Sequence, residues 1–204
     1  YHWVEGERRL RRPMLKTAAG TLEATGWSDV LHALRTRVAP LAASDAASVR
    51  VLASAHASVE ELFVLKSLAE RALGGTRAVT VMWSASEKRQ PAGTTFRVPV
   101  TDAPNVNGAR DLGFAVGVGN AGLPDLASLR AAVEAGQVKA LLVVDPAPAE
   151  LTGDFTWVAE ARAKGTLPLL VVQTVEMSPL VAQADIVLPG AAWLEKDALH
   201  TNDQ

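Results

Sequence analysis

Residues 49–83 read VRVLASAHASVEELFVLKSLAERALGGTRAVTVMW, and this stretch carries the clearest indication of the fold class. It opens with a short run of β-branched apolar residues, which is typical of a buried strand. A helical pattern follows, in which Ser58 and Glu61 have the spacing of a capping box and a Gly-Gly pair ends the helix. A second apolar run at 77–83 predicts another strand. The unit is therefore a strand, a helix and a strand.

The same alternation continues to the end of the chain. We expect further strands at 138–145, 167–174 and 185–189, and helices at 125–137, 155–165 and 178–184. These strands are apolar on both faces, which is typical of a parallel sheet covered by helices on each side. We therefore predict an α/β fold with an open, mostly parallel sheet in Rossmann-like layers. The alternating run 94–100 predicts one additional, weaker strand.

The first residues differ from this pattern. Residues 1–16 carry five Lys or Arg against two Glu and show no hydrophobic period. We expect 1–26 to form a basic, extended and solvated arm or connector, and 27–204 to form the α/β domain. Ser28 can cap a first helix, which Pro40 would stop. Because the chain starts without Met and ends in polar turn formers, we expect it to be an excised fragment that continues beyond residue 204.

Bulk composition excludes several classes of protein. The chain has 204 residues, 49% of them hydrophobic, which is enough for the core of one α/β domain. Its net charge of −2 argues against a general nucleic-acid binder. The absence of cysteine excludes disulfides, thiolate zinc sites and cysteine-held iron–sulfur clusters within this chain. No apolar run approaches the ~20 residues that span a bilayer, so we expect no direct membrane insertion.

A glycine-rich stretch, GVGNAG at 117–122, matches the G-x-G-x-x-G pattern of dinucleotide-binding folds. A helix and then a strand ending at Asp145 follow at the spacing of a ribose-binding acid. A proline and an acid, however, separate the last glycine from the helix proper, whereas the fingerprint needs its third glycine inside the helix. We interpret the stretch as a connection, and NAD binding through Gly117, Gly119 and Gly122 as an alternative.

Other catalytic patterns are sparse. The four histidines, His2, His32, His56 and His200, have no partner at metal-ligand spacing. Ser54 lies near His56, but no G-x-S-x-G elbow accompanies the pair. We therefore predict neither a catalytic residue nor a metal site.

Polar residues follow the predicted strands. In open parallel sheets, ligands bind beyond the carboxyl ends of the strands. The segments DPAPAE (145–150) and QTVEMS (173–178) lie at two such ends. The polar tail PGAAWLEKDALHTNDQ (189–204) follows the last strand. We expect this tail to lie where such a sheet binds a ligand or a partner.

The same tail carries a family resemblance. The stretch ADIVLPGAAWLEKDALHTNDQ (184–204) resembles ADvVLPaaaf-EKdGTfTNtEGRvQ of the molybdopterin oxidoreductases. A second match is APNVNGARDLG (103–113), which resembles the family's NNVqGa-DMG. A third is YHWVEGERRLRRPML (1–15), which looks like the segment after the family's cysteine-rich iron–sulfur domain. The similarity covers nearly the whole chain. The most similar variety is the large G subunit of NADH-quinone oxidoreductase, respiratory complex I.

This resemblance implies a parent protein that carries iron–sulfur clusters upstream and relays electrons from NADH toward quinone. It would be peripheral, on the cytoplasmic side of the bacterial inner membrane. Its partners would be the other subunits of the complex I peripheral arm and the upstream iron–sulfur domain, with no nucleic acid. The basic arm would contact that domain or a neighbouring subunit through Arg8, Arg9, Arg11 and Arg12.

In the molybdenum enzymes of this family, the crevice holds a pterin–guanine dinucleotide. By the resemblance, the residues that would border it here are Asn107, Asp145, Glu195, Lys196, Asp197, His200, Thr201 and Asn202. The chain departs from the family pattern at several of these places. The family's G-NP appears as Asp145-Pro146, and Ala198 and His200 replace a Gly and a Phe. No residue stands at a known spacing for a molybdenum ligand.

We therefore expect a vestigial pterin crevice and no cofactor in this chain, which would be a non-catalytic module of the complex I G subunit. The alternative is a fragment of an active molybdopterin-dependent oxidoreductase, similar to formate dehydrogenase. Only that alternative implies bound molybdopterin guanine dinucleotide.

Overall fold

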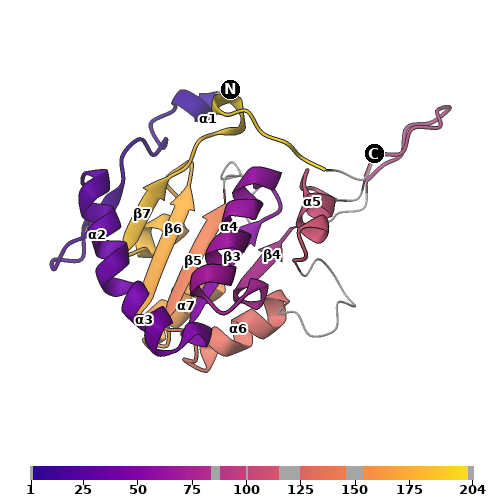
Figure 1. Cartoon of the computed structure of the whole chain (residues 1–204). Helices are drawn as coiled ribbons and strands as arrows, with labels where there is room; N and C mark the ends of the chain where they lie inside the picture. The colour runs from indigo at the N-terminus through magenta and orange to yellow at the C-terminus, as the bar shows by residue number, and fades with distance from the viewer. Residues whose placement is uncertain (1, 84–87, 100, 115–124, 146–153, 202–204) are drawn as a thin grey trace.

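A computed structural model describes residues 2–83, 88–99, 101–114, 125–145 and 154–201 of the chain. Within these residues, seven strands form one sheet in the order β2-β1-β7-β6-β5-β3-β4 (Figure 1). The strands are β1 (Met14–Lys16), β2 (Leu22–Ala24), β3 (Val49–Ser54), β4 (Val79–Met82), β5 (Ala140–Asp145), β6 (Leu169–Thr174) and β7 (Ile186–Pro189). All pairings among β3 to β7 are parallel, which confirms the predicted open, mostly parallel α/β sheet.

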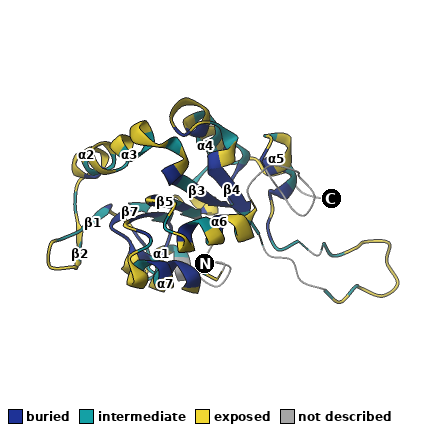
Figure 2. Ribbon diagram, turned by 90° about the horizontal axis from the view of Figure 1, so that it is seen from below, coloured by how far each residue is buried: buried dark blue, intermediate teal, exposed yellow. Residues whose placement is uncertain are grey.

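Helices cover both faces of this sheet (Figure 2). They are α1 (His2–Glu5), α2 (Trp27–Arg37), α3 (Ala39–Ser44), α4 (Val59–Ala72), α5 (Val106–Asp111), α6 (Leu126–Glu134), α7 (Thr156–Lys164) and α8 (Pro179–Gln183). Alternate residues of β5 show the two layers, because Leu141 packs with α6 and α7 while Leu142 faces the side of α2 and α4. None of the described helices has the length and apolarity that a membrane crossing requires.

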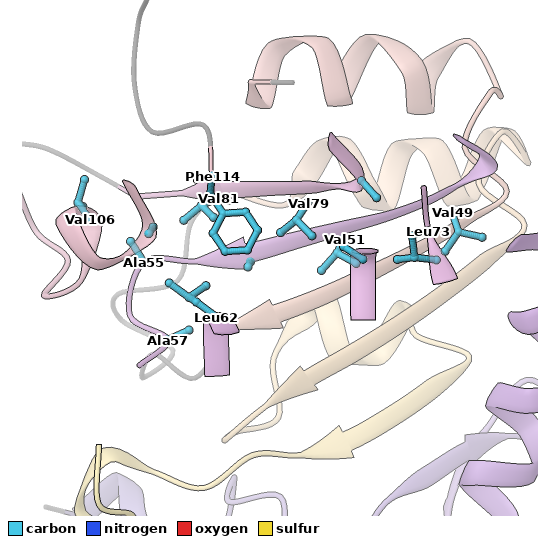
Figure 3. Packing of buried hydrophobic residues seen from close by; sticks show 14 of the residues in the cluster. Val49, Val51, Ala55, Ala57, Leu62, Leu73, Val79, Val81, Val106 and Phe114 are labelled. Carbon is cyan, nitrogen blue, oxygen red and sulfur yellow. The ribbon is translucent and has the colours of Figure 1, made fainter. Parts of the chain in front are cut away.

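The core on the α4 side is built from small, β-branched strand residues and larger helix residues (Figure 3). Val51 and Val79 lie on neighbouring strands, and Leu62 of α4 packs against this layer with no exposed surface. The predicted capping box starts α4: the Ser58 hydroxyl accepts from the Glu61 N–H, and the Glu61 carboxylate accepts from the Ser58 N–H. The cap therefore gives two backbone N–H groups at the start of α4 a hydrogen-bond partner.

Two local expectations from the sequence were wrong, and a third was incomplete. The N-cap of α2 is Gly26, so Ser28 lies inside the helix and makes no cap. The first helix, α2, ends at Arg37, before Pro40 as expected, but a second short helix, α3, follows, and Pro40 lies in its first turn, where its missing N–H leaves no helical bond unmade. Residues 94–99 form no strand, because the arm they belong to does not reach the edge of the sheet.

The first 26 residues contribute to the sheet. Strand β1 pairs antiparallel with β7 on one side and with β2 on the other. Leu10, just before β1, is buried in the core on the α7 side. This pairing satisfies backbone groups that β7 would otherwise expose as an edge strand. The domain boundary after residue 26 stays a prediction, but the segment is not extended and solvated throughout.

Candidate functional site

The order of the parallel strands contains a switch point. From β3 the chain adds β4 on one side, and β5, β6 and β7 follow on the other side. The connections that leave the carboxyl ends of β3 and β5 therefore diverge, and ligands bind at such points in open α/β sheets. We call the edge formed by residues 54–58, 102–108 and 190–201 the carboxyl rim. The connection after β5, residues 146–153, lies outside the described residues.

The tail after β7 runs along the carboxyl rim, and Figure 1 shows it passing in yellow from β7 toward α5. At its start, the Gly190 N–H donates to the carbonyl of Thr174 at the end of β6, at 2.8 Å. Further along, the Leu199 carbonyl accepts from the N–H of Val59 at the start of α4, at 2.9 Å. The tail therefore lies at the edge where the sequence placed it.

Arg9 ties the N-terminal segment to the start of the tail. Its side chain is only 8% exposed, and its guanidinium donates to the carbonyls of Val175, at 2.9 Å, and Gly190, at 3.0 Å. It also pairs with the carboxylate of Glu195. A hydrogen bond from the Ala192 N–H lowers the pKa of the Glu195 carboxyl, and Arg9 acts in the same direction. Arg9 is thus bound within its own chain, where we had expected a solvated arm.

Lys196 and Glu61 form a second link between the tail and the body. The Lys196 Nζ lies 2.6 Å from the Glu61 Oε2, as an ion pair whose angles fall outside hydrogen-bond geometry. The same carboxylate oxygen accepts from the Ser58 N–H at the start of α4. One carboxylate therefore serves both the helix cap and the tail. The neighbouring Asp197 is exposed.

A third link joins Thr201 to Asn105, the residue before α5. The Thr201 N–H donates to the Asn105 Oδ1 at 2.9 Å, and the Asn105 amide donates to the Ala57 carbonyl at 2.8 Å. Asn105 is fully buried. Gly108 makes room for it, because a Cβ there would lie 2.0 Å from the Asn105 Oδ1. The buried amide of Asn105 thus joins three segments: the loop after β3, the start of α5 and the tail.

Sequence reasoning selected Asn107 instead of Asn105 in this segment. The side-chain Oδ1 of Asn107 accepts from the guanidinium of Arg110, which is exposed, and Asn107 is only half-buried. Asn105 carries a detectable signal, because it stands just before the helix and three residues before Gly108. A glycine three residues after Asn105 leaves space in the first turn of the helix for the Asn105 side chain.

The remaining predicted site residues are not gathered into one cluster. His200 is exposed. Asp145 ends β5 opposite Thr174 of β6, so its backbone lies at the carboxyl rim. Asn202 lies outside the described residues, as does the glycine-rich stretch 117–122.

His56 and Ser54 form a small polar group just after β3. The Ser54 Oγ lies 3.0 Å from the His56 Nδ1 and accepts from the His56 backbone N–H at 3.2 Å. Burial lowers the pKa of the His56 imidazole, and the backbone carbonyl of Asp102 and its carboxylate oppose that shift. The ring is therefore neutral at pH 7. Ser54 is itself buried, and its hydroxyl stabilises this turn through the two contacts with His56.

The polar side chains described at the carboxyl rim form ion pairs and hydrogen bonds within the chain. Arg9, Lys196 and Asn105 each hold the tail through a partner in the same chain. Within the described residues, no three His, Cys, Asp or Glu side chains are arranged to hold a metal ion.

A scan against protein-family models matches the model described as molybdopterin oxidoreductase over residues 101–204. The matched region contains α5 to α8, β5 to β7 and the tail. A search of the curated proteins finds no match.

Proposed function

The chain belongs to the molybdopterin oxidoreductase family, and we propose that it serves there as a non-catalytic structural module of the G subunit of a complex I-type NADH-quinone oxidoreductase. The observation that carries this proposal is that the polar groups described at the carboxyl rim are already paired within the chain. The side chains best placed to meet a cofactor are bound to other groups of the same chain. In this proposal, these interactions at the rim fix the tail to the rest of the domain.

The described rim residues do not fit a pterin–guanine dinucleotide. The pyrophosphate of such a ligand needs free N–H groups or unpaired cations. Here Arg9 is paired with Glu195, Lys196 with Glu61, and the Thr201 N–H with Asn105. The ligand would have to break these interactions, and each buried group left unpaired costs about 1–3 kcal/mol. The carboxylates of Glu61 and Glu195 would also repel the pyrophosphate.

The placement in complex I rests on the resemblance of the tail, of residues 103–113 and of the first 15 residues. In this proposal, an upstream iron–sulfur domain and the other subunits of the peripheral arm are the partners. The assembly lies on the cytoplasmic side of the bacterial inner membrane, and this chain holds no cofactor. Arg9 is bound internally, and Arg8, although exposed, pairs with Glu176, so contact with the upstream domain falls to the exposed side chains of Arg11 and Arg12.

Metal and nucleotide analysis tests the proposal. The parent protein is purified from cells grown with molybdate, and molybdenum is measured by mass spectrometry. Guanine nucleotide released by acid is measured on the same sample. A molybdenum enzyme prepared in parallel is the positive control. We expect iron in the parent protein and neither molybdenum nor guanine nucleotide at one per chain. Stoichiometric molybdenum with guanine nucleotide would overturn the proposal and establish the active, formate dehydrogenase-like alternative.

A further inference from the structure

Residues 88–99 form an arm that projects from the body of the molecule between β4 and α5. Figures 1 and 2 show it extending away from the sheet and its helices in two perpendicular views. Every residue from 91 to 97 is exposed. The arm contributes nothing to the described core, so its sequence is not needed for packing.

The side chain of Gln90 joins the two limbs of this arm, which do not pair as β-strands. The Gln90 amide accepts from the Val98 N–H at 2.9 Å and donates to the Val98 carbonyl at 3.2 Å. Lys88 pairs with Asp102 at 2.6 Å and thereby ties the base of the arm to the body. The arm is therefore shaped before any partner binds, which reduces the entropy lost on docking.

The arm carries one exposed aromatic residue, Phe96, and two exposed arginines, Arg89 and Arg97. Phe96 is 52% exposed, and its N–H donates to the Thr94 hydroxyl at 3.0 Å, which helps to set the turn. Arg89 and Arg97 are exposed, and no described residue forms an ion pair with either. Residues 88–99 contain no Asp or Glu, although the chain as a whole has a net charge of −2. The arm is thus locally positive with one large apolar group.

We propose that this arm docks onto a neighbouring protein by inserting Phe96 into an apolar pocket whose edge carries carboxylates. Aromatic residues and arginine are the side chains that most often dominate binding energy at interfaces. A single ring with two arginines that pair with no described residue is too little for a membrane surface or for nucleic acid, which favour larger basic clusters. The proposal is independent of what the carboxyl rim binds, since the arm shares no residue with the tail.

Site-specific photocrosslinking in the parent protein, expressed in its own cells, tests this docking. A photoreactive phenylalanine analogue replaces Phe96, and the same analogue at the exposed position Leu31 is the control for random encounters. We expect illumination to link position 96, but not position 31, to one protein. The cross-linked peptide of that protein should carry both apolar residues and Asp or Glu.

Charge reversal tests the chemistry of the contact. Arg89→Glu with Arg97→Glu should reduce the yield of the crosslink on the order of tenfold or more, because cationic side chains would then face carboxylates with the wrong sign. The matched control is Arg71→Glu, an exposed arginine on α4, which should leave the yield unchanged. Crosslinks only within this chain or to a second copy, to nucleic acid or lipid, or to nothing would overturn the proposal. A yield that does not respond to the double reversal would do the same.

Discussion

Replacing Asn105 with alanine removes two hydrogen bonds at the carboxyl rim in one step. The lost donor faces the Ala57 carbonyl at 2.8 Å, and the lost acceptor faces the Thr201 N–H at 2.9 Å. Ala57 is fully buried, so its carbonyl would stay unpaired at a cost of about 1–3 kcal/mol. Thr201 is exposed, so water replaces most of the second bond. We expect the free energy of unfolding to fall by about 2 kcal/mol.

The matched control is Asn107→Ala, two residues along the chain. Its side-chain partner Arg110 is exposed, so the free energy of unfolding should change by about 0.5 kcal/mol or less. For a chain of this length, a loss of about 2 kcal/mol in Asn105→Ala corresponds to a decrease in Tm of roughly 4–8 °C. Urea unfolding followed by circular dichroism measures both variants, and equal m-values are required for the comparison.

Amide hydrogen exchange adds a local readout. The Thr201 N–H should exchange faster in Asn105→Ala and at the unchanged rate in Asn107→Ala, because only the first change removes its acceptor. Equal losses of stability in the two variants, or a larger loss for Asn107→Ala, would refute the assignment of Asn105 as the residue that anchors the tail.

Three further predictions concern the rim and the glycine-rich stretch. Gly108→Ala should lower the free energy of unfolding by about 1–3 kcal/mol, because the new Cβ displaces Asn105, and it should also speed exchange at Thr201; unchanged exchange would contradict this. The lowered pKa of Glu195 means that its contribution to stability is present above the pKa of the unfolded state and is lost as pH falls through the lower folded value. Glu195→Gln should therefore weaken the protein at pH 7 and flatten its acid unfolding curve, whereas an unaltered pH profile in urea titrations would argue against the Ala192 hydrogen bond and the Arg9 pairing as the causes of the lowered pKa. NADH should not bind the chain at micromolar concentration in fluorescence titrations; binding that Gly119→Val abolishes would restore the dinucleotide alternative.

Local patterns predicted most of the elements. The strands were recognisable because a strand covered on both faces needs a continuous apolar run, and β5 and β6 have one. Helix α4 was recognisable because the capping box of Ser58 and Glu61 involves residues three apart. The misplaced cap at Ser28 shows the limit, since a residue suited to capping can also lie within the first turn.

The alternation of strands and helices, and with it the edge of the sheet at which the polar tail lies, could be predicted from local sequence patterns. Which polar groups meet at that edge depends on contacts between distant parts of the folded chain. Arg9 and Glu195 stand 186 residues apart, and Thr201 and Asn105 stand 96 apart. Hydrophobic periodicity and capping act over a few residues, so they carry no information about such pairs. Burial and hydrogen bonding across the folded chain place Asn105 where it binds the tail at Thr201, and place Arg9 where it binds the start of the tail at Gly190 and Glu195.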